Sequence, residues 1–223
     1  HAQIEPAEKA HADLFKVVQD NMCEAPPERH PSWLAHWLEE IGRNLSLSPL
    51  LTTAVAAVEA LKGSAQRERW FPGILAGETI AALAIDEKGK HGNAVAMKAE
   101  RSGNGFRLSG AKQFVTHGHV AGLLIVAART AGSSHDDAGV TLFAVPKDAA
   151  GLTADPQRLA DSSLASRLTF DGVAVDADAV IGEVDGGRSV LSALLAAGRT
   201  GVAAESHGVG GGGRDLPRHS LRG

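Results

Sequence analysis

Apolar residues in the first third of the chain recur at the spacing of amphipathic helices. Leu34, Trp37, Leu38 and Ile41 stand at positions i, i+3, i+4 and i+7, which places them on one helical face. A second periodic run lies between Pro49, which suits a first helical position, and Gly63, which suits a helix end. The pattern therefore predicts helices over 34–41, 49–63 and 64–72, and a further helix over 7–20.

Near Gly77 the helical spacing gives way to short apolar runs separated by turn-forming residues. The expected strands cover residues 106–108, 113–116, 123–128, 140–145 and 166–175. Turns are expected at 102–105 and again at Ser109-Gly110. Several short strands with such turns favour a compact β-barrel or sandwich of about 100 residues.

Helical spacing returns at about Gly187, with Val190, Leu191, Leu194 and Leu195. Four consecutive glycines then occupy positions 210–213. Because glycine costs a helix interior roughly 1 kcal/mol relative to alanine, we expect this helix to stop near Gly208. A flexible basic tail is expected after it.

Composition narrows the possible classes of protein. The chain has 223 residues, of which 43% are hydrophobic and 22% charged, the balance of a globular protein. A formal net charge of −4 argues against a nucleic-acid-binding surface. The sole cysteine excludes an internal disulfide and a multi-cysteine zinc site. We expect a piece of a soluble, cytoplasmic protein with no membrane span.

Local motifs carry little chemistry by themselves. Gly208-x-Gly210-x-x-Gly213 formally matches a dinucleotide fingerprint, but a predicted helix precedes it where that motif needs a strand. His117 and His119, with His91 upstream, would permit metal binding. Solvated turn histidines are the favoured interpretation, because no acidic or thiol partner stands at a suitable spacing, and no metal site is assigned.

A longer pattern, from Trp37 to about Gly208, resembles the FAD-dependent acyl-CoA dehydrogenase family. Each matching stretch is weak alone, but their order and spacing are specific. The stretches are Leu38–Arg43, Trp70–Glu78, Gly105–Thr116, Val120-Ala121, Ala128–Thr130, Phe170–Val175 and Ala197–Ala204.

The resemblance implies an α+β multidomain fold. An N-terminal helical domain (residues 1–78) would precede a middle β-barrel domain (79–184), and the start of a C-terminal helical bundle with a flexible tail would follow (185–223). FAD would lie between the barrel and the C-terminal helices. Most of the family's C-terminal domain has no counterpart here, so we expect an incomplete fragment that is inactive alone.

The implied reaction belongs to fatty acid and lipid metabolism. A carboxylate removes the α-proton of an acyl-CoA thioester, the β-hydride passes to N5 of FAD, and the 2,3-enoyl-CoA results. An electron-transfer flavoprotein is the expected acceptor, and the full-length form is expected to be a homo- or hetero-oligomer.

The resemblance also assigns candidate site residues. Phe114, Val115 and Thr116 match the family's Trp-Ile-Thr triplet beside the flavin. Ile85 and Asp86 match a second flavin-contacting stretch, in which Glu87 corresponds to the glutamate of Thr-Glu-Pro. Lys90 and His91, in the same stretch, are candidates for substrate binding.

No catalytic residue is assigned. In many members of the family the base lies beyond the last residue of this chain, and in others it precedes the arginine that matches Arg199, where this chain has Gly198. A non-catalytic flavin-binding or structural subunit of a hetero-oligomeric acyl-CoA dehydrogenase is therefore the alternative function.

Overall fold

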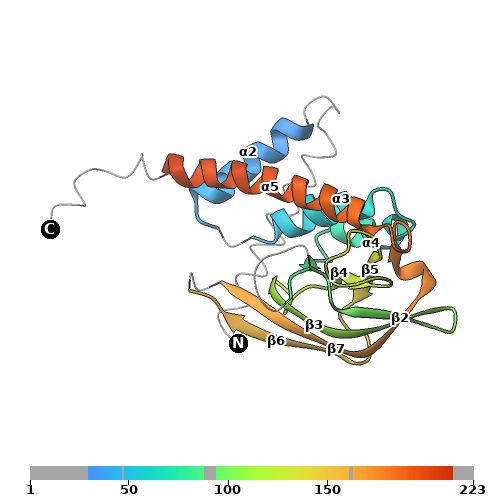
Figure 1. The fold of residues 1–223 in the computed structure, drawn as a ribbon. Coiled ribbons are helices and arrows are strands. Elements are labelled where there is room, and N and C mark those ends of the chain that lie inside the picture. Colours follow the sequence, from blue (N-terminus) through green and yellow to red (C-terminus); the bar gives the residue numbers. More distant parts are fainter. Residues whose placement is uncertain (1–29, 47, 88–93, 161–162, 213–223) are drawn as a thin grey trace.

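A layer of helices lies on one face of a strongly curved β-sheet (Figure 1). The computed structural model describes residues 30–46, 48–87, 94–160 and 163–212, so the helix expected over 7–20 and the tail after Gly213 lie outside the described residues. The helices are α2 (His30–Arg43), the π-helical segment η2 (Leu51–Ala57), α3 (Val58–Leu61), α4 (Gln66–Leu75) and α5 (Gly187–Gly212). No helix among the described residues is long and apolar enough to cross a membrane.

Within the described ranges the sheet has eight strands: seven follow the order β6-β7-β3-β2-β4-β5-β8, and β1 pairs in parallel with β4. The short helix η3 (Ala177–Ala179) leads from β7 into β8. The strands are β1 (Ala81–Ala84), β2 (Lys98–Ser102), β3 (Gly105–Thr116), β4 (Leu123–Arg129), β5 (Val140–Pro146), β6 (Leu152–Arg158), β7 (Leu164–Asp176) and β8 (Val180–Ile181).

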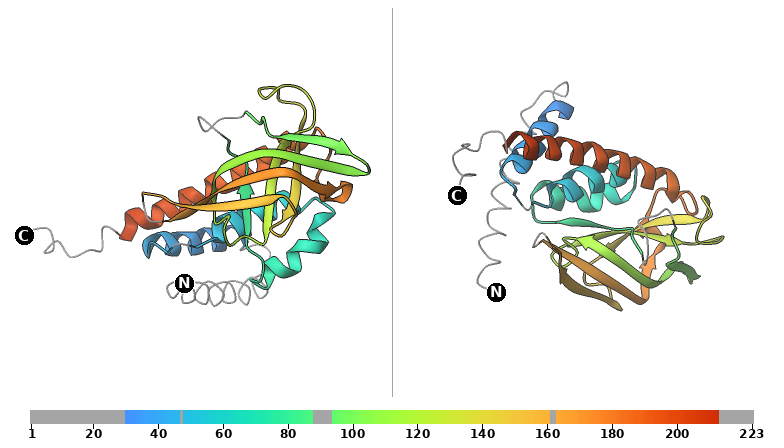
Figure 2. Two further views of the ribbon diagram at one scale, coloured as in Figure 1. Left: turned by 90° about the horizontal axis from the view of Figure 1, so that it is seen from below. Right: turned by 60° about the vertical axis from the view of Figure 1, so that its left-hand side comes forward.

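The predicted closed barrel is not confirmed. In the described part of the chain no pairing joins the outer strands β6 and β8, and β2 meets β4 through the single pair Lys98–Arg129. The sheet instead curls so that its two halves face each other across an apolar interior (Figure 2). This interior holds Phe106 and Leu108 from β3 together with Phe143 and Val145 from β5.

Strand β4 is buried along its whole length because each of its faces meets a different core. Leu124, Val126 and Ala128 point into the interior of the curled sheet. Leu123, Ile125 and Ala127 pack with residues of α3, α4 and α5 on the other side. The continuous apolar run in the sequence is therefore the pattern of a strand covered on both faces.

Helix α5 packs against α2, η2 and α3. The predicted start of a separate C-terminal bundle is therefore not confirmed, since α5 lies on the N-terminal helices. The expected stop near Gly208 is also wrong, because α5 continues to Gly212. A Cβ atom on Gly208 would overlap the carbonyl oxygen of Glu39, and one on Gly42 would overlap that of Glu205. Glycine thus lets two helix backbones approach closely, which offsets its low helix propensity.

Two other predicted boundaries are wrong. Helix α4 does not stop at Pro72, and the amide of Ala76 donates to the carbonyl of Pro72 at 3.0 Å, so the chain continues helically and buries Ile74. Ser109-Gly110 is not a turn between two strands. It is an irregularity within the 12-residue strand β3, where Gly110 has a φ of +144° and lies against Met97.

The contact of Gly208 with α2 gives a stability test. Gly208→Ala should lower the free energy of unfolding by about 1–3 kcal/mol, because the new methyl group meets backbone atoms that have no room to move. Gly210→Ala is the matched control on the same helix, since an added Cβ there has no atom within 4 Å. It should raise stability by about 0.5–1 kcal/mol. Urea unfolding of both variants checks this, and equal effects would contradict the close-approach explanation.

Candidate flavin-facing site

The segment that follows β1 lies against the last residues of β3. The backbone amide of Gln113 donates to the carbonyl oxygen of Asp86 at 2.9 Å, and Lys112 Nζ donates to that of Ile85 at 3.3 Å. The structure therefore brings together the two stretches that the sequence proposed for one site, although 27 residues separate Ile85 from Lys112.

A bulge in β3 turns Phe114 out of the sheet. Lys112 pairs with Leu168 and Val115 with Ser166, so three steps along β3 match two along β7. Phe114 has a φ of +54°, and its side chain is 50% exposed. A bulky residue in the left-handed region costs of order 1–3 kcal/mol, so this conformation needs support from its surroundings. The result is an aromatic ring presented at the surface, next to the buried Val115.

The other predicted site residues differ in how they are exposed. Thr116 is exposed at the end of β3. Val115 is fully buried in the interior of the curled sheet, so its side chain anchors the strand and does not face a ligand. Ile85 is half-buried and packs against the core between sheet and helices. Asp86 is also half-buried, and Lys90 and His91 lie outside the described residues.

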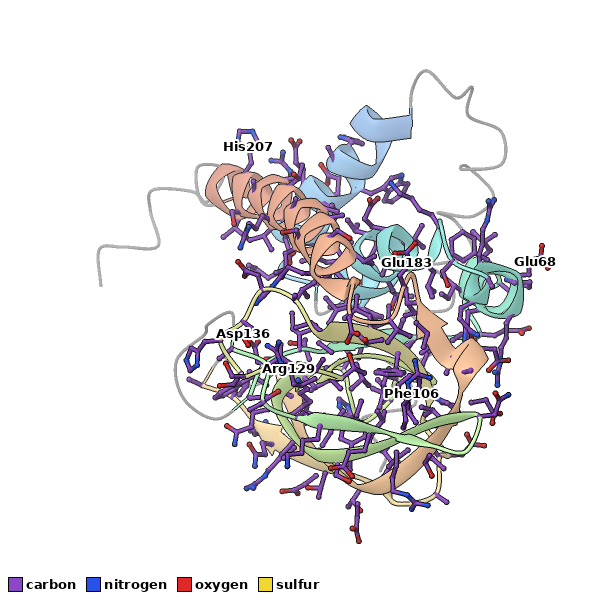
Figure 3. All side chains as sticks on the ribbon, turned by 45° about the vertical axis from the view of Figure 1, so that its right-hand side comes forward. Glu68, Phe106, Arg129, Asp136, Glu183 and His207 are labelled. Atoms are coloured by element: carbon purple, nitrogen blue, oxygen red, sulfur yellow. The ribbon has the colours of Figure 1, made fainter. Side chains whose placement is uncertain are left out.

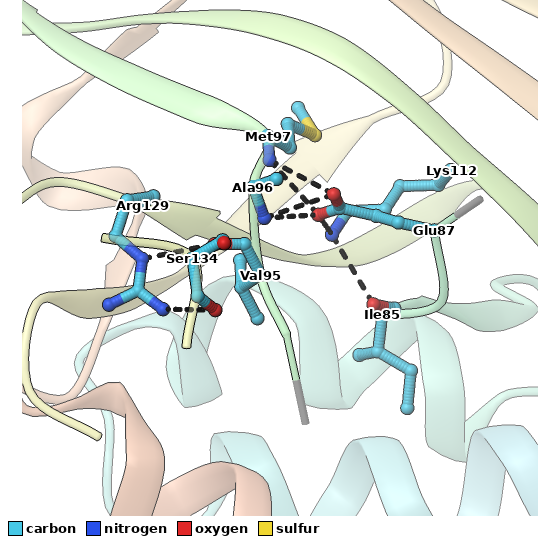
Figure 4. Close-up of polar contacts among 8 residues, drawn as sticks. All are labelled: Ile85, Glu87, Val95, Ala96, Met97, Lys112, Arg129 and Ser134. Atoms are coloured by element: carbon cyan, nitrogen blue, oxygen red, sulfur yellow. Dashed lines mark hydrogen bonds and ion pairs between the residues drawn. The ribbon is translucent and has the colours of Figure 1, made fainter. Parts of the chain in front are cut away.

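An ion pair between Glu87 and Lys112 joins the two stretches that form this site (Figure 4). Lys112 Nζ is 2.7 Å from Glu87 Oε1, and the lysine side chain is 0% exposed. The Glu87 carboxylate also accepts hydrogen bonds from the backbone amides of Ala96 and Met97, at 3.0–3.2 Å. Burial lowers the pKa of Lys112, while the neighbouring Glu87 carboxylate acts to raise it.

Sequence reasoning missed this pair as a functional feature. Glu87 had a signal, since it matches a glutamate of the family motif, but Lys112 in an alternating strand has the pattern of a solvated residue.

On the other side of residues 95–97, Arg129 is 7% exposed and is held by backbone carbonyl groups. Its Nε donates to Val95 at 3.0 Å, and its terminal nitrogens donate to Ser134, Asp136 and Ala138. Figure 3 shows Arg129 beside Asp136, and Arg129 is the last residue of β4. The 95–97 segment thus lies between a carboxylate that binds its amides and a guanidinium that binds its carbonyl.

His117 and His119 lie in the turn after β3, as expected, but the prediction that they are solvated is wrong in part. Both residues are half-buried, and the Nδ1 atom of His119 is buried with no hydrogen-bond partner among the described residues. Burial lowers the pKa of His119. No group of three metal-ligating side chains occurs in the part of the chain that the structure describes.

The half-buried imidazole of His119 predicts a dependence of stability on pH. Because the folded-state pKa of His119 lies below its ordinary value of 6.5, the unfolded chain binds more protons as the pH falls through that value. The stability contributed by neutral His119 is present above pH 6.5 and is lost in acid. The free energy of unfolding of the wild type relative to His119→Gln should therefore fall between pH 7.5 and pH 5.5, as measured by urea unfolding. A constant difference would contradict this assignment.

Fold and sequence together define the class of the protein. Residues 82–173 match the family profile of the acyl-CoA dehydrogenase middle domain. The chain belongs to the acyl-CoA dehydrogenase family.

Particular relatives bear out this assignment. The chain is 31% identical over 156 residues to the very long-chain specific acyl-CoA dehydrogenase of Bos taurus, and the matched region is 65% of this chain and 24% of the relative. It is 30% identical over 150 residues to the short-chain specific enzyme of the same species, and there the matched region is 65% of this chain and 36% of the relative. The chain thus spans about a quarter to a third of the length of these relatives.

Solved structures share the fold. The Tcur3481–Tcur3483 steroid ACAD superposes with a TM-score of 0.77 at 24% identity, covering 89% of this chain and 55% of that one. A probable acyl-CoA dehydrogenase from Mycobacterium abscessus superposes with a TM-score of 0.65 at 29% identity, covering 70% of this chain and 43% of that one. The FAD complex of PigA superposes with a TM-score of 0.71 at 22% identity, covering 79% of this chain and 49% of that one.

Proposed function

We propose that this chain supplies the sheet side of the flavin site in an FAD-dependent acyl-CoA dehydrogenase. One observation carries the proposal: the bulge in β3 presents Phe114 at the surface, beside the chain segment that follows β1. Membership of the acyl-CoA dehydrogenase family supports flavin-dependent oxidation of an acyl-CoA as the activity of the whole protein.

The residues present fit a flavin. Its isoalloxazine ring is flat and largely apolar, and the half-exposed ring of Phe114 offers an aromatic surface on which it can pack. Thr116 is an exposed residue two positions further on, and its hydroxyl group can form a hydrogen bond with a polar edge of the ring. Phe114 lacks the indole N–H of the family's tryptophan, so this chain contributes packing there without that donor.

When bound, FAD accepts the hydride that leaves the β-carbon of the acyl-CoA. The task of this chain's residues is positioning. Phe114 and Thr116 orient the ring, and the buried Val115 fixes the strand that carries them. No described residue is assigned as the base. Glu205, whose pKa is raised by burial, has its backbone carbonyl against Gly42, at the contact of α5 with α2.

We propose an acyl-CoA thioester as the substrate, without a chain length, because the relatives include very long-chain and short-chain enzymes. We propose an electron-transfer flavoprotein as the acceptor and an oligomer as the working form of the whole protein. The first of these follows from the reaction class, since the reduced flavin must pass its electrons on.

Retention of FAD tests the site. After incubation with FAD and desalting, the chain should keep a flavin absorption band. Phe114→Ala should weaken binding roughly 2- to 10-fold, the range for losing one aromatic packing contact. Thr116→Ala should weaken it as well, whereas Leu75→Ala, which shortens an exposed apolar side chain on α4, should not. A folded, colourless wild type, or equal retention by all variants, would refute FAD binding at this site.

The alternative, a non-catalytic flavin-binding or structural subunit, is favoured by Gly198. A carboxylate stands at this position in some family members, and here an added Cβ would have no atom within 4 Å. The fold therefore has room for a side chain that the sequence does not supply.

Anaerobic titration of the FAD-loaded chain with acyl-CoA tests whether these residues include a catalytic base. We expect no loss of the flavin band with this chain alone, because no described residue is assigned to take the α-proton. Bleaching by butyryl-CoA or palmitoyl-CoA would instead place a competent base within these 223 residues.

A further inference from the structure

Resting on the proposed flavin site, we infer that the Glu87–Lys112 ion pair is its positioning device. Glu87 directly follows Asp86, and Lys112 stands two residues before Phe114. The pair therefore joins the two chain segments proposed to face the flavin at the point where each approaches the site. Neither side chain is assigned a contact with the flavin, so the pair acts through the backbone that it holds.

The contacts of the pair fix three backbone segments. The ammonium group of Lys112 binds Glu87 at 2.7 Å and the carbonyl of Ile85 at 3.3 Å. The carboxylate of Glu87 binds the amides of Ala96 and Met97, at the entry to β2. Two side chains thus set the segment after β1, the end of β3 and the approach to β2 relative to one another (Figure 4).

Stability alone does not account for an ion pair at this place. Removing a cation from water is costly, and apolar side chains of similar volume often stabilise a core equally well or better. Lys112 is fully buried, so a methionine would fill much of the same space. A methionine cannot bind the Ile85 carbonyl or hold the Glu87 carboxylate. Compared with an apolar replacement, the ion pair therefore additionally fixes where the flavin-facing segments lie relative to each other.

Arg129 provides a matched control. It is also a buried cation bound to main-chain carbonyls, and it holds the same 95–97 segment from the opposite side. Its guanidinium group donates hydrogen bonds to carbonyl groups of residue 95 and residues 131–138, and among the described residues none goes to 85–87 or 112–116. Arg129→Met should therefore lower thermal stability without altering the proposed flavin site.

The test compares Glu87→Gln, Lys112→Met, the double variant and Arg129→Met in the full chain. Three quantities are measured: the Kd for FAD by flavin fluorescence, the unfolding midpoint, and the hydrogen-exchange rate of the Gln113 amide without FAD. Glu87→Gln and Lys112→Met should each weaken FAD binding at least 10-fold and speed exchange at Gln113 at least 10-fold. Arg129→Met should change both by less than 2-fold.

The double variant should lose no more FAD affinity than the worse single variant, because residues that act as a unit are not additive. Glu87→Gln nearly preserves the shape of the side chain, so it carries the test if Lys112→Met does not fold. Folded variants that keep wild-type FAD affinity and Gln113 exchange would overturn the inference. If the wild type binds no FAD, the proposed function fails, and exchange at Gln113 still decides whether the pair positions the two segments.

Discussion

Burial of β4 on both faces is the constraint on which the rest of the structure depends. One face closes the interior of the curled sheet, and the other carries the helices, so both cores share a single strand. The burial of the strands that pair with β4 follows from its place between the two cores. β1 adds to it in parallel and β5 in antiparallel orientation, and both are covered by the same two cores. The segment that leaves β1 is thereby brought to the end of β3, where the candidate site lies.

The candidate site combines two opposed physical features. Phe114 is in a backbone conformation that phenylalanine adopts at a cost, and its ring remains half in solvent. Two residues earlier in the same strand, a fully buried lysine is held by a carboxylate and a carbonyl oxygen. A costly surface conformation thus stands beside a polar contact that would itself be costly if either partner were missing. This combination suits a surface that must present one ring in one orientation.

Several strands could be predicted from the sequence, and the strands that were missed have physical features that explain why. The long apolar runs of β4 and β5 and the alternation in β7 identified those strands. β1 was missed because it consists largely of alanine. β6 was missed because it is polar, exposed and contains Pro156, features that are typical of an edge strand.

Within the site, strict alternation would place Lys112 and Phe114 on one face, whereas the bulge leaves Lys112 buried and Phe114 exposed. Such an irregularity depends on the pairing with β7, which a single segment does not encode. The open sheet likewise depends on pairing between distant strands.

The bonds of Glu87 to Ala96 and Met97 also have a consequence for how the chain can vary. They tie together two points of the chain that are nine and ten residues apart. The connection between Glu87 and Val95 can change in length while these bonds hold the entry to β2 in place, because the anchor is a side chain outside the exchanged stretch. The entropic cost of a longer connection grows only with the logarithm of its length, about 0.6 kcal/mol for each doubling. The fold can therefore accept new sequence beside its candidate site without rebuilding either core.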